Sequence, residues 1–303
     1  MKGVKELKTR IKSVNNIQKI TKAMEMVAST KLRKLQDRAL ATRPFADRIE
    51  AMMRRVAAHS DPDASPLLNV PDRVETEAVV VVGADKGLCG AYNSNLNRHA
   101  ARLVEEIKDA GVTPKLYVIG RKPQLFFGAV KDLEVTWVHP GVVEKIEYHD
   151  IRRLMDLLVA AFIEDGVQRV RMVYTEMTSM AVFTPTTQDI LPVVTSPATD
   201  AGGEEEAEEA EDADGSDVEY ILEPSPDTIM QRLLPRYLEM QLYAAVLESL
   251  ASEFAARRAA MKNATDAAED MLGTLGMEYN KARQEGITGE LLDIAGGVMV
   301  QAG

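Results

Sequence analysis

Residues 15–31 read NNIQKITKAMEMVASTK, and they lie in a run that has no glycine after Gly3 and no proline before Pro44. Such a run predicts one long helix, although Pro44 leaves open a kink or an end there. Positions three and four residues apart form a seam along it: Val4, Leu7, Ile11, Val14, Gln18, Thr21, Glu25, Ala28, Leu32, Leu35, Ala39, Thr42, Ala46, Ile49, Met53 and Val56. A coiled coil prefers leucine or isoleucine on its seam, so the polar centre from Gln18 to Glu25 needs an explanation of its own.

The end of the chain carries a second long helical pattern, because no proline occurs between Arg236 and Gly303. Its seam runs Met240, Tyr243, Leu247, Leu250, Phe254, Arg257, Met261, Ala264, Ala268, Met271 and Leu275. Each stripe is too narrow for a core of its own, so we expect the two helices to pair.

The middle of the chain alternates strand and helix patterns. The apolar run EAVVVVGA (77–84) is typical of a strand buried on both faces of a parallel sheet, and KLYVIG, EVTWV and VQRVRMVYTEM predict further strands. Two helical segments separate them and end at Gly111 and Gly166. The predicted fold is an antiparallel coiled coil of the N- and C-terminal helices with an inserted Rossmann-like three-layer α/β domain. Its parts are a helix over 1–58, an α/β domain over 74–200, an acidic disordered loop over 201–219 and a helix over 224–303.

The 303 residues carry a formal net charge of −11, which is unevenly distributed. Residues 1–60 hold 15 Lys or Arg and 5 acids, a net +10, whereas AGGEEEAEEAEDADGSDVEY (201–220) has no basic residue. Such an acidic block favours a solvated loop. We expect neither a membrane-spanning helix nor a signal peptide. One cysteine and four scattered histidines predict no disulfide and no metal site, and no cofactor is expected.

The segment GADKGLCGAYNSN (83–95) lies where a nucleotide-binding enzyme carries its phosphate loop. It matches neither GxxxxGK[ST] nor GxGxxG. Three interpretations stay open: a nucleotide site, a tight strand-to-helix turn, and a surface loop that presents Asp85, Lys86 and Cys89 to a partner.

The basic first helix suggests either a solvated surface or contact with nucleic acid, acidic lipid or an acidic protein surface. Residues 1–44 contain no aromatic side chain for base stacking, so we expect no nucleic-acid partner and prefer the protein surface. No nucleophile elbow, paired-carboxylate motif or HExxH is present, which indicates a protein without a reaction centre.

Several blocks resemble the gamma chain of bacterial F-type ATP synthases. They are MKGVKELKTRIKSVNNIQKITKAMEMVASTKLRK, RPFAD, ADKGLCGAYN, LLPRYLEMQLYAAVLESLASEFAARRAAMKNATD and YNKARQEGITGELLDIAGG, in the order of that family. The resemblance implies a non-catalytic rotor shaft, which couples ion flow through the membrane sector to ATP synthesis or hydrolysis in the catalytic ring. The implied partners are the alpha and beta subunits of the ring, the epsilon subunit and the membrane rotor c-ring. The implied location is the cytoplasmic side of the bacterial inner membrane, as a peripheral subunit.

The resemblance also assigns contact residues. Catalytic-subunit contacts fall on Arg283, Gln284, Thr288, Glu290, Lys86, Cys89, Lys19, Lys22 and Met24, and a rotor-ring contact falls on Tyr220. Because the resemblance implies that the segment from Gln18 to Met26 slides past the ring, a polar and loosely packed seam is tolerable there. The alternatives are a small α/β nucleotide-binding protein with helical arms, which must bind nucleotide by itself, and a coiled-coil scaffold.

Overall fold

The computed structural model describes residues 2–57, 59–61, 64–179, 182–193 and 223–302. The chain divides into two compact units. The helical-pair unit consists of Met1–Lys34, Gly87–Tyr92 and Glu253–Gly303, and the α/β unit consists of Leu35–Lys86 and Asn93–Ser252. Two long helices, α1 (Lys2–Ala57) and α5 (Pro226–Ala302), contribute to both units. The predicted acidic loop and Tyr220 lie outside the described residues.

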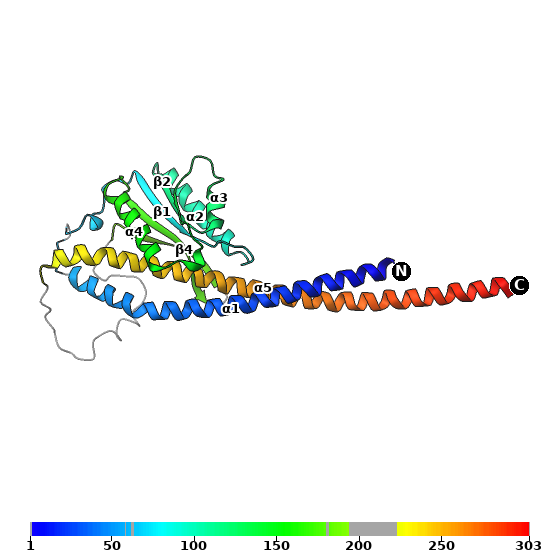
Figure 1. The fold of residues 1–303 in the computed structure, drawn as a ribbon. Helices are drawn as coiled ribbons and strands as arrows, with labels where there is room; N and C mark the ends of the chain where they lie inside the picture. The colour runs from blue at the N-terminus through cyan, green and yellow to red at the C-terminus, as the bar shows by residue number, and fades with distance from the viewer. Residues whose placement is uncertain (1, 58, 62–63, 180–181, 194–222, 303) are drawn as a thin grey trace. The chain divides into compact units, whose positions relative to one another are not determined.

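The α/β unit is built on a five-stranded sheet with the order β3-β2-β1-β4-β5 (Figure 1). The strands are β1 (Thr76–Val82), β2 (Thr113–Ile119), β3 (Glu134–Val138), β4 (Arg169–Ser179) and β5 (Val182–Leu191). The first four strands run parallel, and β5 pairs antiparallel with β4. The prediction that β1 is a buried strand with parallel neighbours is confirmed, and β5 makes the sheet as a whole mixed. The sequence VFTPTTQDIL was missed as a strand because it is polar and contains Pro185, which a strand tolerates at a sheet edge.

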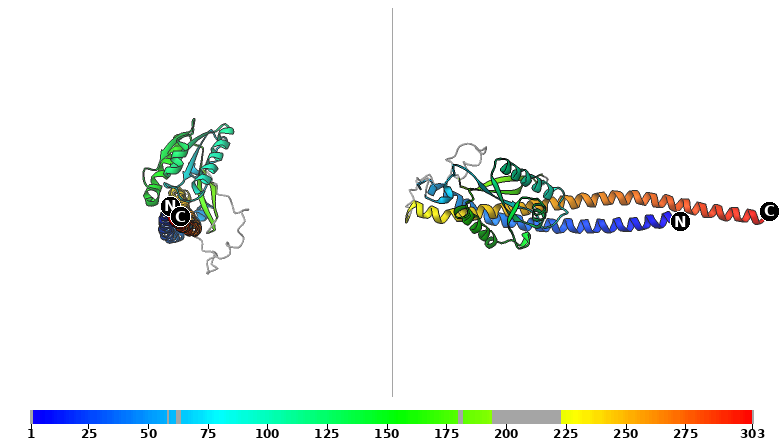
Figure 2. Two further views of the ribbon diagram at one scale, coloured as in Figure 1. Left: turned by 90° about the vertical axis from the view of Figure 1, so that its right-hand side faces the viewer. Right: turned by 90° about the horizontal axis from the view of Figure 1, so that it is seen from above.

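Helices cover both faces of this sheet. Side chains of α2 (Tyr92–Asp109) pack on Val79 and Val81 of β1, together with Leu116 and Val118 of β2. Val80 and Val82 point to the opposite face because side chains alternate along a strand, and that face lies on the side of α4 (Tyr148–Ile163) and α5. The end-on view in Figure 2 shows strands between the two helical layers, as predicted for a three-layer domain.

Short helices complete the unit: η1 (Pro66–Leu68), α3 (Arg121–Phe127) and η2 (Val143–Lys145). The helix α3 was not predicted, because seven residues are too few to display a helical period. Gly111 and Gly166 follow α2 and α4 with φ of 75° and 69°, so both predicted helix ends use glycine in the left-handed conformation.

The helices α1 and α5 are antiparallel. In the helical-pair unit Thr21 of α1 contacts Thr265, whereas Lys31, further along α1, contacts the earlier residue Phe254. In the α/β unit Arg38 contacts Tyr243. Helix α1 continues through Pro44, which resolves the question of a break there.

The structure corrects details of both predicted seams. Ala39 is exposed, and the neighbouring Arg38 turns inward instead. Met271 is exposed, while Leu272 is half-buried. Between Leu238 and Ser252, α5 is buried around most of its circumference, because it packs on the α/β unit as well as on α1. None of the described helices combines the length and hydropathy needed to cross a bilayer.

Candidate functional site

The crevice of the α/β unit that would hold a ligand is filled by a side chain of α5. In open α/β sheets, ligands bind beyond the carboxyl ends of the strands where the strand order reverses, which is between β1 and β4 here. The Ser249 hydroxyl donates to the carbonyl oxygen of Val82, at the end of β1, over 3.1 Å. The hydroxyl oxygen of Ser249 in turn accepts from the backbone N–H of Thr175, in β4, at 3.5 Å. Ser249 is only 1% exposed, so the helix occupies the usual ligand position.

The loop that follows β1 is also tied into the α/β unit. The Asp85 carboxylate accepts from the backbone N–H of Arg121 at 3.1 Å and from that of Val143 at 2.8 Å. A Cβ atom on Gly83 would lie 2.9 Å from the side chains of Leu96 and Pro123, so glycine is required there for packing. These contacts favour the interpretation of a tight strand-to-helix turn over that of a phosphate loop.

The other hollow of interest in this unit is small. It lies between α2 and β5, is lined by His99, Arg102, Leu103, Glu106 and Thr187, and has a volume of about 100 Å³. Ligand sites typically occupy roughly 300–1,000 Å³. Burial lowers the pKa of His99, and its Nε2 lies 2.8 Å from the Thr187 hydroxyl. Among the described residues no group of three or more His, Cys, Asp or Glu could hold a metal ion.

Buried polar groups of the α/β unit join helices instead of forming a reaction centre. Glu239 is buried and accepts hydrogen bonds from the Tyr148 hydroxyl and, at 3.1 Å, from Arg236. Burial raises the pKa of Tyr148, and the bond to Glu239 raises it further. Arg38 donates to the Tyr243 hydroxyl at 2.8 Å and to the carbonyl oxygen of Ile146 at 3.0 Å. The guanidinium therefore links α1 to α5 and to the segment before α4.

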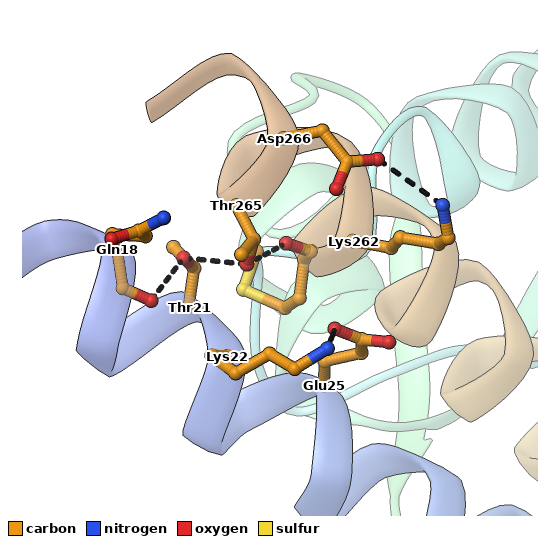
Figure 3. Close-up of polar contacts among 8 residues, drawn as sticks. Gln18, Thr21, Lys22, Glu25, Lys262, Thr265 and Asp266 are labelled. Atoms are coloured by element: carbon orange, nitrogen blue, oxygen red, sulfur yellow. Dashed lines mark hydrogen bonds and ion pairs between the residues drawn. The ribbon is translucent and has the colours of Figure 1, made fainter. Parts of the chain in front are cut away.

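In the helical-pair unit the polar centre of the α1 seam is packed. The hydroxyl oxygens of Thr21 and Thr265 lie 2.8 Å apart in a hydrogen bond (Figure 3). Each also lies within hydrogen-bond distance of a carbonyl oxygen in its own helix, Gln18 at 3.0 Å and Met261 at 2.8 Å. Thr21 is 8% exposed and Thr265 is 7% exposed. The seam is tightly packed at this position, because α5 supplies a matching hydroxyl.

Arg257 is a buried cation on the predicted seam of α5, and the sequence pattern suggested no role for it. Its Nη2 lies 2.6 Å from Oε1 of Glu253, one helical turn earlier, and 3.2 Å from the carbonyl oxygen of Gly87. Its guanidinium also lies 5.0 Å from the centre of the Phe254 ring. The spacing of Glu253 and Arg257 is the signal that could have identified the ion pair. The carbonyl partner, 170 positions away in the chain, had no such signal.

The predicted contact residues near the end of α5 are all exposed: Arg283, Gln284, Thr288 and Glu290. The Thr288 hydroxyl donates to the carbonyl oxygen of Gln284 at 3.0 Å. Residues three, four or seven apart share a helix face, so Arg283 and Glu290 form one row and Gln284 and Thr288 an adjacent row. The structure thus brings these four residues together on one side of α5.

The remaining predicted residues are dispersed. Lys19 and Lys22 are exposed on α1, where Lys22 pairs with Glu25 at 3.0 Å, and Met24 is half-buried. Lys86 is exposed in the α/β unit. Cys89 forms no disulfide and is 1% exposed, so its side chain is directed inward.

Comparisons with known proteins agree with this architecture. Residues 3–299 match the family described as ATP synthase. The chain is 37% identical to the ATP synthase gamma chain of Mycolicibacterium gilvum over 308 aligned residues, with 97% of this chain and 96% of the relative covered. It is also 37% identical to the gamma chain of Dehalococcoides mccartyi strain BAV1, with both chains fully covered.

Solved structures share the fold. A chain of the Euglena gracilis mitochondrial ATP synthase superposes with a TM-score of 0.61 at 16% identity, covering 99% of this chain and 94% of the other. A chain of the central stalk and c-ring structure from Tetrahymena thermophila superposes with a TM-score of 0.55 at 22% identity, covering 81% of this chain and 99% of the other. The chain belongs to the ATP synthase gamma chain family, the non-catalytic central-stalk rotor subunit of F-type ATP synthase.

Proposed function

We propose that this chain transmits rotation to the catalytic ring through the exposed rows of α5 that carry Arg283, Gln284, Thr288 and Glu290. The observation that supports this proposal is that these polar side chains lie beside Ile287 and Leu291, which are 51% and 62% exposed. A helix that leaves polar and large apolar side chains uncovered in this way has a surface suited to partner subunits. The partners in this proposal are the alpha and beta subunits of the ring, with the epsilon subunit and the c-ring completing the rotor assembly.

The proposed mechanism depends on unequal contacts around the shaft. A rotating helix shifts a catalytic subunit between conformations only if the two conformations differ in their free energy of contact with it. Arg283 suits this role, because a guanidinium binds a carboxylate through two parallel hydrogen bonds in a fixed geometry. Its position on one side of α5 makes the contact depend on the rotation angle.

The proposal treats the other predicted residues according to their exposure. Lys86 and Lys19 are exposed and can meet acidic loops of the ring, where solvated ion pairs are weak and exchange readily. Lys22 can make such a contact only after its ion pair with Glu25 breaks. Cys89 supports its loop from within, and Met24 contributes apolar area. Tyr220 remains a proposed contact with the c-ring.

We further propose that the chain works at the cytoplasmic side of a bacterial inner membrane, held there by the complex. The bacterial sources of gamma chains that it resembles support this location. The filled crevice at Ser249 argues against the alternative of a nucleotide-binding protein.

Reconstitution tests the proposal. The purified chain is mixed with the alpha and beta subunits, and complex formation and ATP hydrolysis are measured together. Arg283→Ala with Gln284→Ala should lower turnover while leaving the melting temperature of the chain unchanged, since truncation of exposed polar side chains is usually mild. The matched control is Asn280→Ala with Lys281→Ala, which changes two exposed residues one turn earlier. Equal turnover for the two double variants would contradict the assignment.

A further inference from the structure

His139 places a buried imidazole at the start of the β3–α4 connection, which comprises residues 139–147. The residue is 8% exposed. A Cβ atom on Gly141 would lie 2.8 Å from the Nε2 atom of His139, so the ring packs directly against the backbone of the connection. Neither ring nitrogen forms a hydrogen bond with another residue that the structure describes. A ring in this position favours the neutral form, because protonation would add a buried charge and an N–H donor without an acceptor.

Three charged groups face this imidazole. They are Asp150 and Arg153 of α4 and Asp85 of the loop after β1. The Asp150 carboxylate accepts from the backbone N–H of Glu147 at 3.0 Å, as part of the capping box of α4. This carboxylate therefore has a structural role at the start of α4 while His139 is neutral.

Asp85 has a similar role at the other side of the connection. Its carboxylate accepts from the backbone N–H of Val143, in η2, at 2.8 Å, and from that of Arg121 at 3.1 Å. Closer contact between a protonated His139 and either carboxylate requires one of the groups to move. Such a movement weakens the hydrogen bonds that fix the backbone of the connection.

The end of the same connection contacts both long helices. Arg38 of α1 donates to the carbonyl oxygen of Ile146 at 3.0 Å. The Tyr148 hydroxyl donates to the buried carboxylate of Glu239 in α5, and the Tyr148 ring packs edge-on against that of Tyr243, with centroids 5.6 Å apart. A change in the backbone of the connection therefore reaches contacts with α1 and α5.

We propose that His139 is a pH-sensitive switch: while its ring is neutral the β3–α4 connection stays closed on α1 and α5, and proton uptake opens the connection. The inference does not depend on the proposed contacts between α5 and the catalytic ring. Burial lowers the pKa of His139 from its ordinary 6.5, and Asp150 and Asp85 offset only part of this effect. The open connection, in which the ring reaches water, thus binds the proton more readily than the closed one. The free energy of opening should be constant above pH 6.5 and should fall as the pH drops from 6.5 through the lowered pKa.

Hydrogen exchange of the amides at 141–150 in the full-length chain measures this opening, after correction for the intrinsic pH dependence of exchange. The equilibrium constant for opening should rise by up to roughly tenfold between about pH 7.5 and 5.5, because a group with an ordinary histidine pKa is mostly protonated at the lower pH in the open form. His139→Gln should remove this rise, since glutamine does not titrate. The matched control is His149→Gln, which replaces an exposed ring whose Nε2 lies 3.4 Å from the same Asp150, and it should retain the rise.

The outcomes decide the assignment. An opening constant that changes by less than about twofold between the two pH values in the unchanged chain would refute the switch. An NMR titration of the His139 imidazole in the unchanged chain gives a second test, which stands even where His139→Gln does not fold: a pKa of 6.5 or above would also refute the proposal. If His149→Gln removes the rise and His139→Gln retains it, the response belongs to the exposed ring and the assignment to His139 is wrong.

Discussion

Ser249 and Ser252 provide a matched test of how α5 is fixed to the sheet. Both serines lie on α5 in the α/β unit, and they are 1% and 0% exposed. The Ser249 hydroxyl bridges β1 and β4, whereas the Ser252 hydroxyl has no hydrogen-bond partner among the described residues. The same substitution to alanine therefore removes a bonded hydroxyl in one case and an unbonded one in the other.

Only Ser249→Ala is expected to lower the free energy of unfolding. Ser249→Ala loses a hydrogen bond and leaves the buried carbonyl oxygen of Val82 unsatisfied, which costs about 2 kcal/mol. Ser252→Ala removes a polar group that is buried without compensation, so its effect lies between zero and a gain of about 1 kcal/mol. For a cooperative unit of this size, 2 kcal/mol corresponds to a decrease in Tm of roughly 4–8 °C.

Thermal and urea unfolding of the two variants, followed by circular dichroism, measure this difference. The urea slope should stay unchanged, since neither substitution alters the surface that unfolding exposes. A decrease of the same size in both variants would refute the reasoning, because it would show that the loss of serine itself, and not the bridge, sets the stability.

Three further predictions concern other polar and glycine positions. A double-mutant cycle of Thr21→Val and Thr265→Val should give a coupling energy of about 1 kcal/mol in chemical unfolding; additive effects would disprove the hydrogen bond as a stabilising contact. Burial raises the pKa of Glu248 above its ordinary 4.5, so the folded state holds this proton more tightly than the unfolded state. The free energy of unfolding should then decline as the pH rises from the ordinary pKa of Glu248 through its raised pKa. Glu248→Gln should flatten this part of the stability profile against pH, and an unchanged profile would contradict the raised pKa of Glu248. Gly273→Ala with Gly276→Ala should stabilise α5 by about 1 kcal/mol per site, because neither added Cβ would meet an atom within 4 Å outside the adjacent backbone of its own helix. Hydrogen exchange near these residues should slow, and faster exchange would argue against the prediction.

Periodicity in the sequence was sufficient to predict the long helices and the first four strands. The helices α1 and α5 carry mostly apolar residues three and four positions apart over many turns, and such a pattern is typical of a long helix. The strand β1 is a continuous apolar run, which indicates burial on both faces. In contrast, β5 is a polar edge strand and α3 is too short to show a period, so neither produced a signal.

Contacts between distant segments could not be predicted in the same way. The hydrogen bond between Thr21 and Thr265 depends on the register of two helices, which a single sequence does not specify. The inward position of Arg38 reflects partners supplied by Tyr243 and Ile146. The resemblance marked Cys89 as a contact residue, but only the structure shows that its side chain is buried.

The position of Ser249 at the reversal of the strand order makes α5 a permanent intramolecular ligand of the sheet. A bound metabolite leaves its site when its concentration falls, whereas a tethered helix is present at an effective concentration set by the chain itself. The contact between the sheet and α5 at Ser249 is consequently independent of the concentration of nucleotide in the cell. The α/β unit thus carries a helix of its own chain at the position where open α/β sheets bind a ligand.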